Sequence, residues 1–368
     1  MQVLKINNTM KNLFYLNLSI ILLNLQLSYS QNKETVVSMS NSNWEIAKGT
    51  STFEIFDSRE TLLLNGKAIL KNKQFSNGTI EVDVYANKER SFAGIIFRKQ
   101  QKTMEEVYMR LHKSNQADAI QYSPTYNEEL TWQLYKEYQA NVTFKNKGWN
   151  TLRIEVNQDN ADVFVNDEKV LTVGNLKTTH DKGEIGLFAL FSNRFSNFKF
   201  TNKDVVSQTK KEEKHDIESS IISQWNITKA FPFTEKKLRF NNFSKEEYTT
   251  VTTEKSGLLP FSKYIEKPSS GNFEKNKEVY SVASTIIESN NNQVKLFSFD
   301  YSDKIIVYLN GKAIFKGNNA FRSKGIQYQG HIDNNANKLY LNLKKGKNIL
   351  HCVVIDKANG WGLIAKLE

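Results

Sequence analysis

Arginine, tyrosine and amide side chains recur in the first half of the chain with the spacing of β-strands. Tyr108 and Arg110 alternate with the apolar Val107 and Met109, and successive side chains of a strand point to opposite faces. Tyr108 and Arg110 therefore share one face. Flat aromatic rings stack on the faces of sugar rings, and forked guanidinium and amide groups bond to hydroxyls. The pattern predicts a concave sheet face that binds carbohydrate.

Neighbouring segments add residues of the same types. Consecutive antiparallel strands are usually adjacent in a sheet, so side chains before and after the segment 106–112 are expected to converge on this face. The candidate ligand-binding residues are Arg98, Tyr108, Arg110, Gln121, Tyr122, Tyr126 and Trp132. A solvated sheet face of amphipathic residues is the competing interpretation. In addition, either Trp132 or Tyr122 could equally belong to the core.

Other chemistries have weaker support. Two-His metal spacing is absent from the five histidines, which are His112, His180, His215, His331 and His351. His351 and Cys352 are adjacent in a predicted strand and would face opposite ways, so they cannot form a nucleophilic pair. No nucleophile elbow, phosphate loop or dinucleotide fingerprint occurs. We predict no catalytic residue and no cofactor, and leave calcium at loop Asp or Asn oxygens open.

The first thirty residues are typical of a signal peptide. Lys5 and Lys11 precede an apolar run over 13–27 that Asn17 and Asn24 interrupt, and the run is too short for a membrane anchor. We expect cleavage after Ser30 and an exported, periplasmic, extracellular or cell-surface protein with no integral membrane segment in the mature chain. The single cysteine excludes an intramolecular disulfide, so stability must come from apolar cores.

The formal net charge is +11, which raises the question of nucleic acid. The lysines, however, are interspersed with acidic residues, as in the segment 210–214, and form no basic patch or stripe. We therefore predict no nucleic-acid partner. Attraction to an acidic polysaccharide or to an anionic cell surface remains open.

Period-two alternation in short runs bounded by Gly, Asn and Asp predicts an all-β protein. More than ten strands are expected between residues 40 and 203, including 106–112 and 131–138, which indicates a β-sandwich. A charged linker over 204–220 and a second β-sandwich over 221–368 follow. The sequence Leu-Asn-Gly-Lys-Ala-Ile occurs at 64–69 and again at 309–314. We interpret it as the same two-residue hairpin turn used twice.

Several strand segments of the first region resemble those of concanavalin A-like lectin and glucanase domains of the laminin-G type. The resemblance rests on the segments 78–84, 93–98, 107–110, 121–122, 132–134 and 183–187. It implies a jelly-roll sandwich whose concave face or rim often binds carbohydrate. The Gly-Ile-Ile-Phe-Arg segment at 94–98 is also similar to 3-keto-disaccharide hydrolases.

Glucanases of that superfamily carry the pattern Glu-x-Asp-x-x-Glu, which draws attention to Glu81 and Asp83. The position three after Asp83 is Ala86, so the acid that retaining chemistry requires about 5–5.5 Å from the nucleophile is missing. We expect Glu81 and Asp83 to form an ordinary polar strand face.

The second region resembles the galactose-binding-like jelly rolls appended to many glycosidases. The resemblance rests on 305–312, on 341–348 and on Gly360-Trp361-Gly362. It implies a scaffold more than a ligand. Trp361 could be a stacking platform, although a core position is favoured.

These observations predict an exported, monomeric, non-catalytic protein that binds a glycan or polysaccharide on the first sandwich. A glycoside-processing enzyme resembling 3-keto-disaccharide hydrolases is the first alternative, and an adhesive or structural surface protein is the second. Because the linker lacks apolar periodicity, we further expect each sandwich to fold alone, with first proteolysis at 210–214 and sugar affinity in the N-terminal piece.

Overall fold

Strict alternation of apolar and polar residues in the segment 78–86 produces a strand with one buried face. The computed structural model describes residues 34–87, 89–203, 218–235, 238, 240–267, 276–333 and 336–368. In it, β4 (Gly78–Ala86) buries Ile80, Val82 and Val84 completely. The side chains between them, including Glu81 and Asp83, point outward. The strand therefore forms one wall of a core.

The first sandwich is a single sheet whose long last strand joins two layers. Its strands are β1 (Thr35–Val37), β2 (Trp44–Phe56), β3 (Arg59–Leu70), β4, β5 (Phe92–Gln100), β6 (Thr103–Arg110), β7 (Ile120–Tyr126), β8 (Glu129–Leu130), β9 (Gln139–Ala140), β10 (Gly148–Asn157), β11 (Asn160–Val165), β12 (Glu168–Gly174) and β13 (Glu184–Asn202). The first half of β13 pairs with β5 and the second half with β4. Apolar side chains from both layers fill one core.

The second sandwich packs two sheets around a separate core. The larger sheet has the order β16 (Thr249–Thr252), β14 (Gln224–Ile227), β18 (Val279–Ser289), β23 (Gly346–Asp356), β20 (Lys304–Leu309), β21 (Lys312–Asn318), with β15 (Phe231–Pro232) beside β18. The smaller sheet has the order β17 (Leu258–Pro260), β24 (Gly362–Leu367), β19 (Gln293–Ser302), β22 (Asn337–Leu343). Trp361 is 1% exposed and stacks on Phe261, so it is a core residue, as favoured above.

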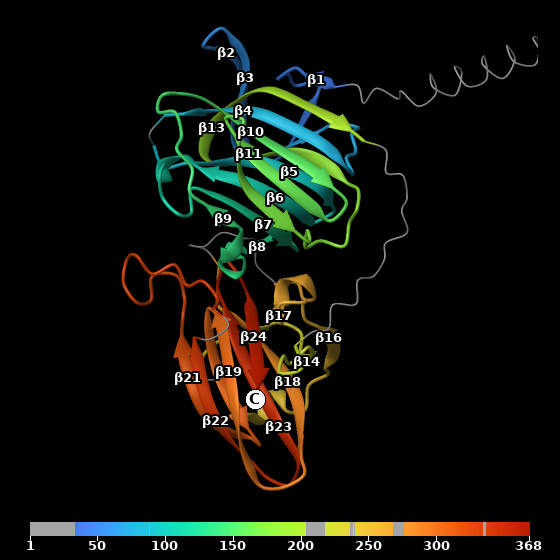
Figure 1. The fold of residues 1–368 in the computed structure, drawn as a ribbon, viewed down its shortest axis with the longest axis vertical. Helices are drawn as coiled ribbons and strands as arrows, with labels where there is room; N and C mark the ends of the chain where they lie inside the picture. The colour runs from blue at the N-terminus through green and yellow to red at the C-terminus, as the bar shows by residue number, and fades with distance from the viewer. Residues whose placement is uncertain are drawn as a thin grey trace, which may run out of the picture.

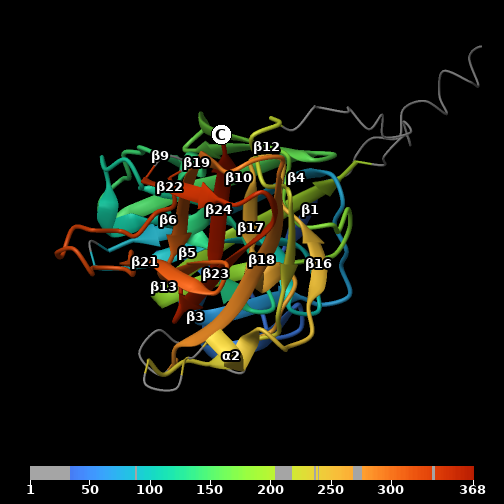
Figure 2. The ribbon, with the colours of Figure 1, turned by 90° about the horizontal axis from the view of Figure 1, so that it is seen from below.

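The two sandwiches are stacked end to end (Figure 1), with β7, β8 and β9 of the first facing β17 and β24 of the second. Seen from below (Figure 2), the second sandwich lies in front of the first. The described elements are strands, short 3-10 turns and the four-residue helix α2 (Phe240–Phe243). The prediction of an all-β protein is confirmed. Among the described residues, no helix has the length and apolarity to cross a membrane.

Two local predictions are wrong. The segment 131–138 is not a strand but two 3-10 turns, η2 (Trp132–Leu134) and η3 (Lys136–Tyr138). Asn65-Gly66 is not a hairpin turn either, because it lies inside the continuous strand β3 and pairs with β2. The same pair at Asn310-Gly311 does form the predicted turn, with φ of 49° and 80°.

The expected signal peptide at 1–30 and nearly all of the expected linker at 204–220 lie outside the described residues. Both remain predictions. The structure does describe contacts between the two sandwiches, and the expectation that each sandwich folds alone stays a prediction. The backbone of Gln133, for example, bonds to residues of the second sandwich on both sides.

Candidate functional site

A buried arginine organises the polar face of β6 and β7. Arg110 is 4% exposed; its Nη1 donates to the carbonyl of Asp118 at 2.8 Å and its Nη2 to the Tyr108 hydroxyl at 3.2 Å. Nη2 also donates to the side-chain carbonyl of Gln121. The Gln121 amide is fully buried and donates to the carbonyl of Trp132 at 2.8 Å. Tyr108, Arg110 and Gln121 therefore form one network, as the alternation predicts.

Tyr108 lies over a glycine of the neighbouring strand. A Cβ atom added to Gly94 would meet the Cβ of Tyr108 at 2.5 Å, so only glycine lets the two strands pack this way. Burial raises the pKa of Tyr108 to about 12, while the charge of Arg110 acts in the opposite direction. The phenol is therefore neutral at ordinary pH and can both donate and accept a hydrogen bond.

Glu106 is the site residue that the sequence analysis missed. It lies two positions before Tyr108 in β6, on the same face, and is 1% exposed. Its Oε1 pairs with Lys67 Nζ of β3 at 2.9 Å, whereas its Oε2 is buried and has no hydrogen-bond partner in the described structure. The period-two rule that selected Tyr108 would also have selected Glu106. A buried carboxylate oxygen without a partner is uncommon in folded proteins, and this one is available to accept a hydrogen bond.

Trp132 reaches this face from η2 rather than from a strand. Its half-buried ring has the Arg110 guanidinium carbon 5.9 Å from the ring centroid. Two rings of the second sandwich, Phe321 at 5.8 Å and His331 at 5.5 Å, contact it edge to face. We call the set Lys67, Glu106, Tyr108, Arg110, Gln121 and Trp132 the β6–β7 face.

Three predicted residues lie elsewhere. Tyr122 points into the core, where its hydroxyl donates to Glu105 Oε2 at 2.6 Å. Arg98 is 2% exposed and binds the carbonyls of Ser76 and Gln158 as a structural clamp. A register shift after Phe97 turns its side chain away from the β6–β7 face.

Tyr126 is the third residue outside the face. It is 2% exposed, and its hydroxyl donates to the carbonyl of Lys177 at 2.9 Å. Burial raises the pKa of this phenol well above its ordinary value, with the charge of Glu254 adding to the shift. Its hydroxyl therefore bonds to a loop of the first sandwich and takes no part in the network of Arg110.

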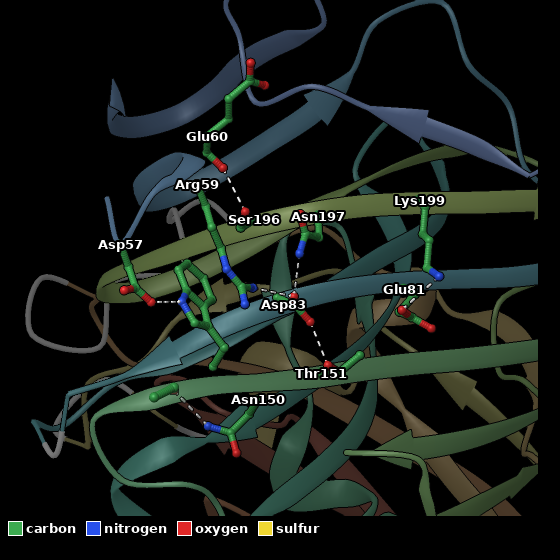
Figure 3. Close-up of polar contacts among 12 residues, drawn as sticks. Asp57, Arg59, Glu60, Glu81, Asp83, Asn150, Thr151, Ser196, Asn197 and Lys199 are labelled. Atoms are coloured by element: carbon green, nitrogen blue, oxygen red, sulfur yellow. Dashed lines mark hydrogen bonds and ion pairs between the residues drawn. The ribbon is translucent and has the colours of Figure 1, made fainter. Parts of the chain in front are cut away.

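The carboxylates of β4 are paired on the outer face of the other layer (Figure 3). Asp83 accepts hydrogen bonds from Arg59 at 2.8 Å, Thr151 at 2.6 Å and Asn197 at 2.8 Å. Glu81 lies 3.2 Å from Lys199 Nζ. Both carboxylates are thus engaged by cationic or polar side chains of neighbouring strands. This is the ordinary polar strand face that we expected.

Within the described residues, no group of three or more His, Cys, Asp or Glu side chains is arranged to hold a metal ion. Calcium at loop oxygens, left open by the sequence, therefore gains no support from a ligand cluster in this part of the chain. The only cysteine, Cys352, is buried, and burial raises the pKa of its thiol. It is consequently a core residue and not a nucleophile.

These features define the class of protein: an all-β chain of two stacked sandwiches with a buried polar network on an outer face of the first. Residues 31–201 match the family model described as the 3-keto-alpha-glucoside-1,2-lyase-like domain. This match confirms the resemblance to 3-keto-disaccharide-processing domains for the first sandwich. The galactose-binding-like resemblance of the second sandwich stays a prediction.

The chain is also similar to solved structures of low sequence identity. One is the carbohydrate-binding module CBM66 from Bacillus subtilis, with 14% identity, 43% of this chain and 94% of that chain covered, and a TM-score of 0.33. Another is a β-1,3-1,4-glucanase (lichenase) derived from a mouse hindgut metagenome, with 10% identity, 46% and 99% covered, and a TM-score of 0.33. No curated protein matches the chain.

Proposed function

We propose that the protein is an exported carbohydrate-binding protein whose glycan lies on the β6–β7 face. The network of Arg110, Gln121 and Tyr108 beside the half-buried Trp132 ring is the observation that carries this proposal. Packing already fixes these side chains, so little conformational freedom is lost when a ligand binds. The match to a family model whose description names a glucoside supports a saccharide as the ligand.

Two tryptophans of the first sandwich provide a matched test. Trp132 lies at the β6–β7 face, whereas Trp149 is also half-buried but lies on the outer face of β10 and donates to Asp57 Oδ2 at 2.7 Å. A glycan array identifies ligands, and calorimetry then measures affinity. Trp132→Ala should weaken binding by about 1–2 kcal/mol, roughly the energy of an aromatic contact together with a hydrogen bond. Trp149→Ala should leave it unchanged, and equal losses in both variants would refute the site.

A second candidate function is cleavage of a 3-keto-glycoside, which the unpartnered Oε2 of Glu106 favours. A ketone at C3 acidifies the hydrogen at C2, so a carboxylate can remove this proton. The C2–H electron pair forms an enolate between C2 and C3. As the C3 carbonyl re-forms, a C1=C2 double bond forms, the C1–O bond breaks, and the leaving oxygen takes a proton from water. Lys67, 2.9 Å from Oε1 of Glu106, would stabilise the developing negative charge. Incubation with 3-keto-glycosides followed by product analysis distinguishes this function from binding alone.

Export is supported by the charged and apolar pattern of the first thirty residues. Expression with the native N-terminus, followed by fractionation and N-terminal sequencing, tests it. The secreted or periplasmic fraction should contain a chain that begins at Gln31. Recovery of the protein in the cytoplasm with residues 1–30 intact would exclude export.

A further inference from the structure

The second sandwich contacts the first directly beside the β6–β7 face. The Gln133 backbone N–H donates to the Asn359 carbonyl at 3.1 Å, and its carbonyl accepts from the Ile332 N–H at 3.1 Å. Its side-chain amide donates to the Gln329 carbonyl at 2.8 Å. Gln133 is fully buried. The residue that follows Trp132 is thus fixed by the second sandwich on three sides.

A hydrogen-bonded chain of side chains runs from the second sandwich into the arginine network. Gln139 Nε2 donates to His331 Nε2 at 3.3 Å and to Gln121 Oε1 at 3.0 Å. Gln121 Oε1 in turn accepts from Arg110. An imidazole that accepts at Nε2 carries its proton on Nδ1. Burial, with the charges of Lys136 and Arg110 adding to it, lowers the pKa of His331 to about 4, so the ring is neutral at pH 7.

His331 also lines a cavity of about 440 Å³, whose size suits a small ligand. Lys136 comes from η3 of the first sandwich, and the other lining residues come from the second. They include Asp300, Asn319, Lys324, Tyr328 and Asn337. The cavity and the β6–β7 face therefore meet at His331, which contacts Trp132 on one side and forms part of the cavity wall on the other.

The cavity lining suits an uncharged, hydroxyl-rich ligand. The cations Lys136 and Lys324 are balanced by the carboxylates of Asp300 and Asp333. Asp300 is held by the side-chain amide of Asn319 at 2.7 Å and by the Asp333 N–H at 2.8 Å. Ammonium and imidazole N–H groups can bond to sugar hydroxyls, and the Tyr328 ring adds a flat surface.

We infer that the carbohydrate site spans both sandwiches and takes an uncharged oligosaccharide, with one sugar residue on the β6–β7 face and the next in the cavity beside His331. This inference rests on the proposed function and extends it to the second sandwich. It assigns His331 and Lys136 to recognition of the second sugar residue. Trp132, in contrast, contacts the first sugar residue.

The test compares the monosaccharide with its disaccharide and trisaccharide for whichever glycan the full chain binds. Calorimetry is done on the wild type, His331→Ala, Lys136→Ala and the control Lys338→Ala. Lys338 is an exposed lysine beside the cavity residue Asn337 but outside the lining. The wild type should bind the disaccharide about tenfold more tightly than the monosaccharide, the equivalent of one or two added hydrogen bonds. Lys136→Ala should lose this gain and keep the monosaccharide affinity, His331→Ala should lose the gain as well, and Lys338→Ala should behave as wild type.

The other possible results of this calorimetry would overturn either the two-residue site or the proposed function. If the gain with chain length persists in both variants, or if Lys136→Ala weakens the monosaccharide equally, the two-residue site is refuted while the proposed function stands. If the wild type binds no glycan, the proposed function fails and this inference falls with it. Circular dichroism and His331→Gln, which keeps a polar side chain, separate a folding defect from lost recognition.

Discussion

Glu106 is the residue whose chemistry separates a binding protein from an enzyme. One of its carboxylate oxygens is paired with Lys67 and the other has no partner within the described residues. Recognition needs only stacking and hydrogen bonds, whereas proton abstraction needs the negative charge of this carboxylate. The neutral and nearly isosteric Glu106→Gln removes the charge and keeps the shape.

We predict that Glu106→Gln lowers any turnover of a 3-keto-glycoside by at least about 100-fold, the usual contribution of a general base. Glycan affinity should change by less than about tenfold, because an amide still forms hydrogen bonds. Glu184→Gln is the control, since Glu184 is another carboxylate of the first sandwich paired with a lysine, Lys99, at 2.6 Å. Turnover that survives in Glu106→Gln would exclude this residue as the base.

Alternation along β6 was sufficient to predict that Tyr108 and Arg110 share the polar face, because their apolar neighbours fix which side chains face the core. It did not decide between Gln121 and Tyr122, since both can lie on either face of a sheet. Glu105 decides which of the two faces the core, because this buried carboxylate accepts a hydrogen bond from the Tyr122 hydroxyl on the core side. The alternation of residues within one strand does not indicate a partner that lies on another strand.

At the scale of elements, identical hexapeptides form different structures. In β3, Gly66 pairs with Gly49, and a Cβ atom on Gly66 would meet the Lys48 carbonyl oxygen at 1.9 Å. In the hairpin between β20 and β21, a Cβ atom on Gly311 would meet only a Phe240 ring carbon at 3.4 Å. The turn needs glycine for its positive φ alone, whereas β3 needs it for close approach of two backbones.

Gly66→Ala should therefore destabilise the protein more than Gly311→Ala. We expect a loss of about 2–5 kcal/mol for Gly66→Ala, from the positive φ and the clash together, and of about 1–2 kcal/mol for Gly311→Ala, from the positive φ alone. Denaturant unfolding of both variants measures the difference. Equal losses would show that β2 and β3 separate to accept the methyl group.

The segment 131–138 is one whose secondary structure the local sequence pattern predicts wrongly. Its alternating apolar residues favour a strand, yet the Gln133 backbone bonds to Asn359 and Ile332 of the second sandwich instead of to a strand neighbour. Contacts between residues more than 190 positions apart thus override the local pattern. Most other strands were predictable because both of their neighbours lie in the same sandwich.

At the scale of the whole molecule, one buried lysine connects the two sandwiches. Lys267 lies 2.7 Å from Glu129 of the first sandwich and 2.5 Å from Asp356 of the second. Asp303 lies beside this group and bonds to the Lys357 N–H, while its Oδ1 has no partner in the described residues. One cation is thus surrounded by three carboxyl groups, and they cannot all be ionised at low energy.

This arrangement predicts a specific pH dependence of stability. Burial, with the charge of Asp356 adding to it, raises the pKa of Asp303 to about 8. The folded protein then holds a proton that the unfolded chain releases above about pH 4, so stability should fall as pH rises from about 4 to 8. Asp303→Asn cannot ionise and should show a smaller fall, measured as the melting temperature at pH 5, 7 and 9. Parallel curves for the two proteins would refute this assignment.

The contacts between the sandwiches also bear on whether the two separated pieces of the chain can fold alone. Leu134 and Tyr135 pack against Leu258 and Ile364 across the junction, and the pair of Lys267 with Glu129 also crosses it. Isolated pieces ending near 201 or beginning near 219 would expose this apolar surface and leave buried charges without partners, which costs about 3–5 kcal/mol for a broken pair. We therefore expect independent folding of the pieces to be impaired.

A protease site placed at positions 210–214 tests this directly. After complete cleavage, the two pieces should still elute together at the mass of one chain, because the junction and not the connecting segment holds them. Lys267→Met removes the shared cation and should make the cleaved pieces separate at lower denaturant concentration. Elution of two separate folded pieces from the cleaved wild type would show that the sandwiches are independent modules, and glycan affinity retained by the N-terminal piece would place the whole site there.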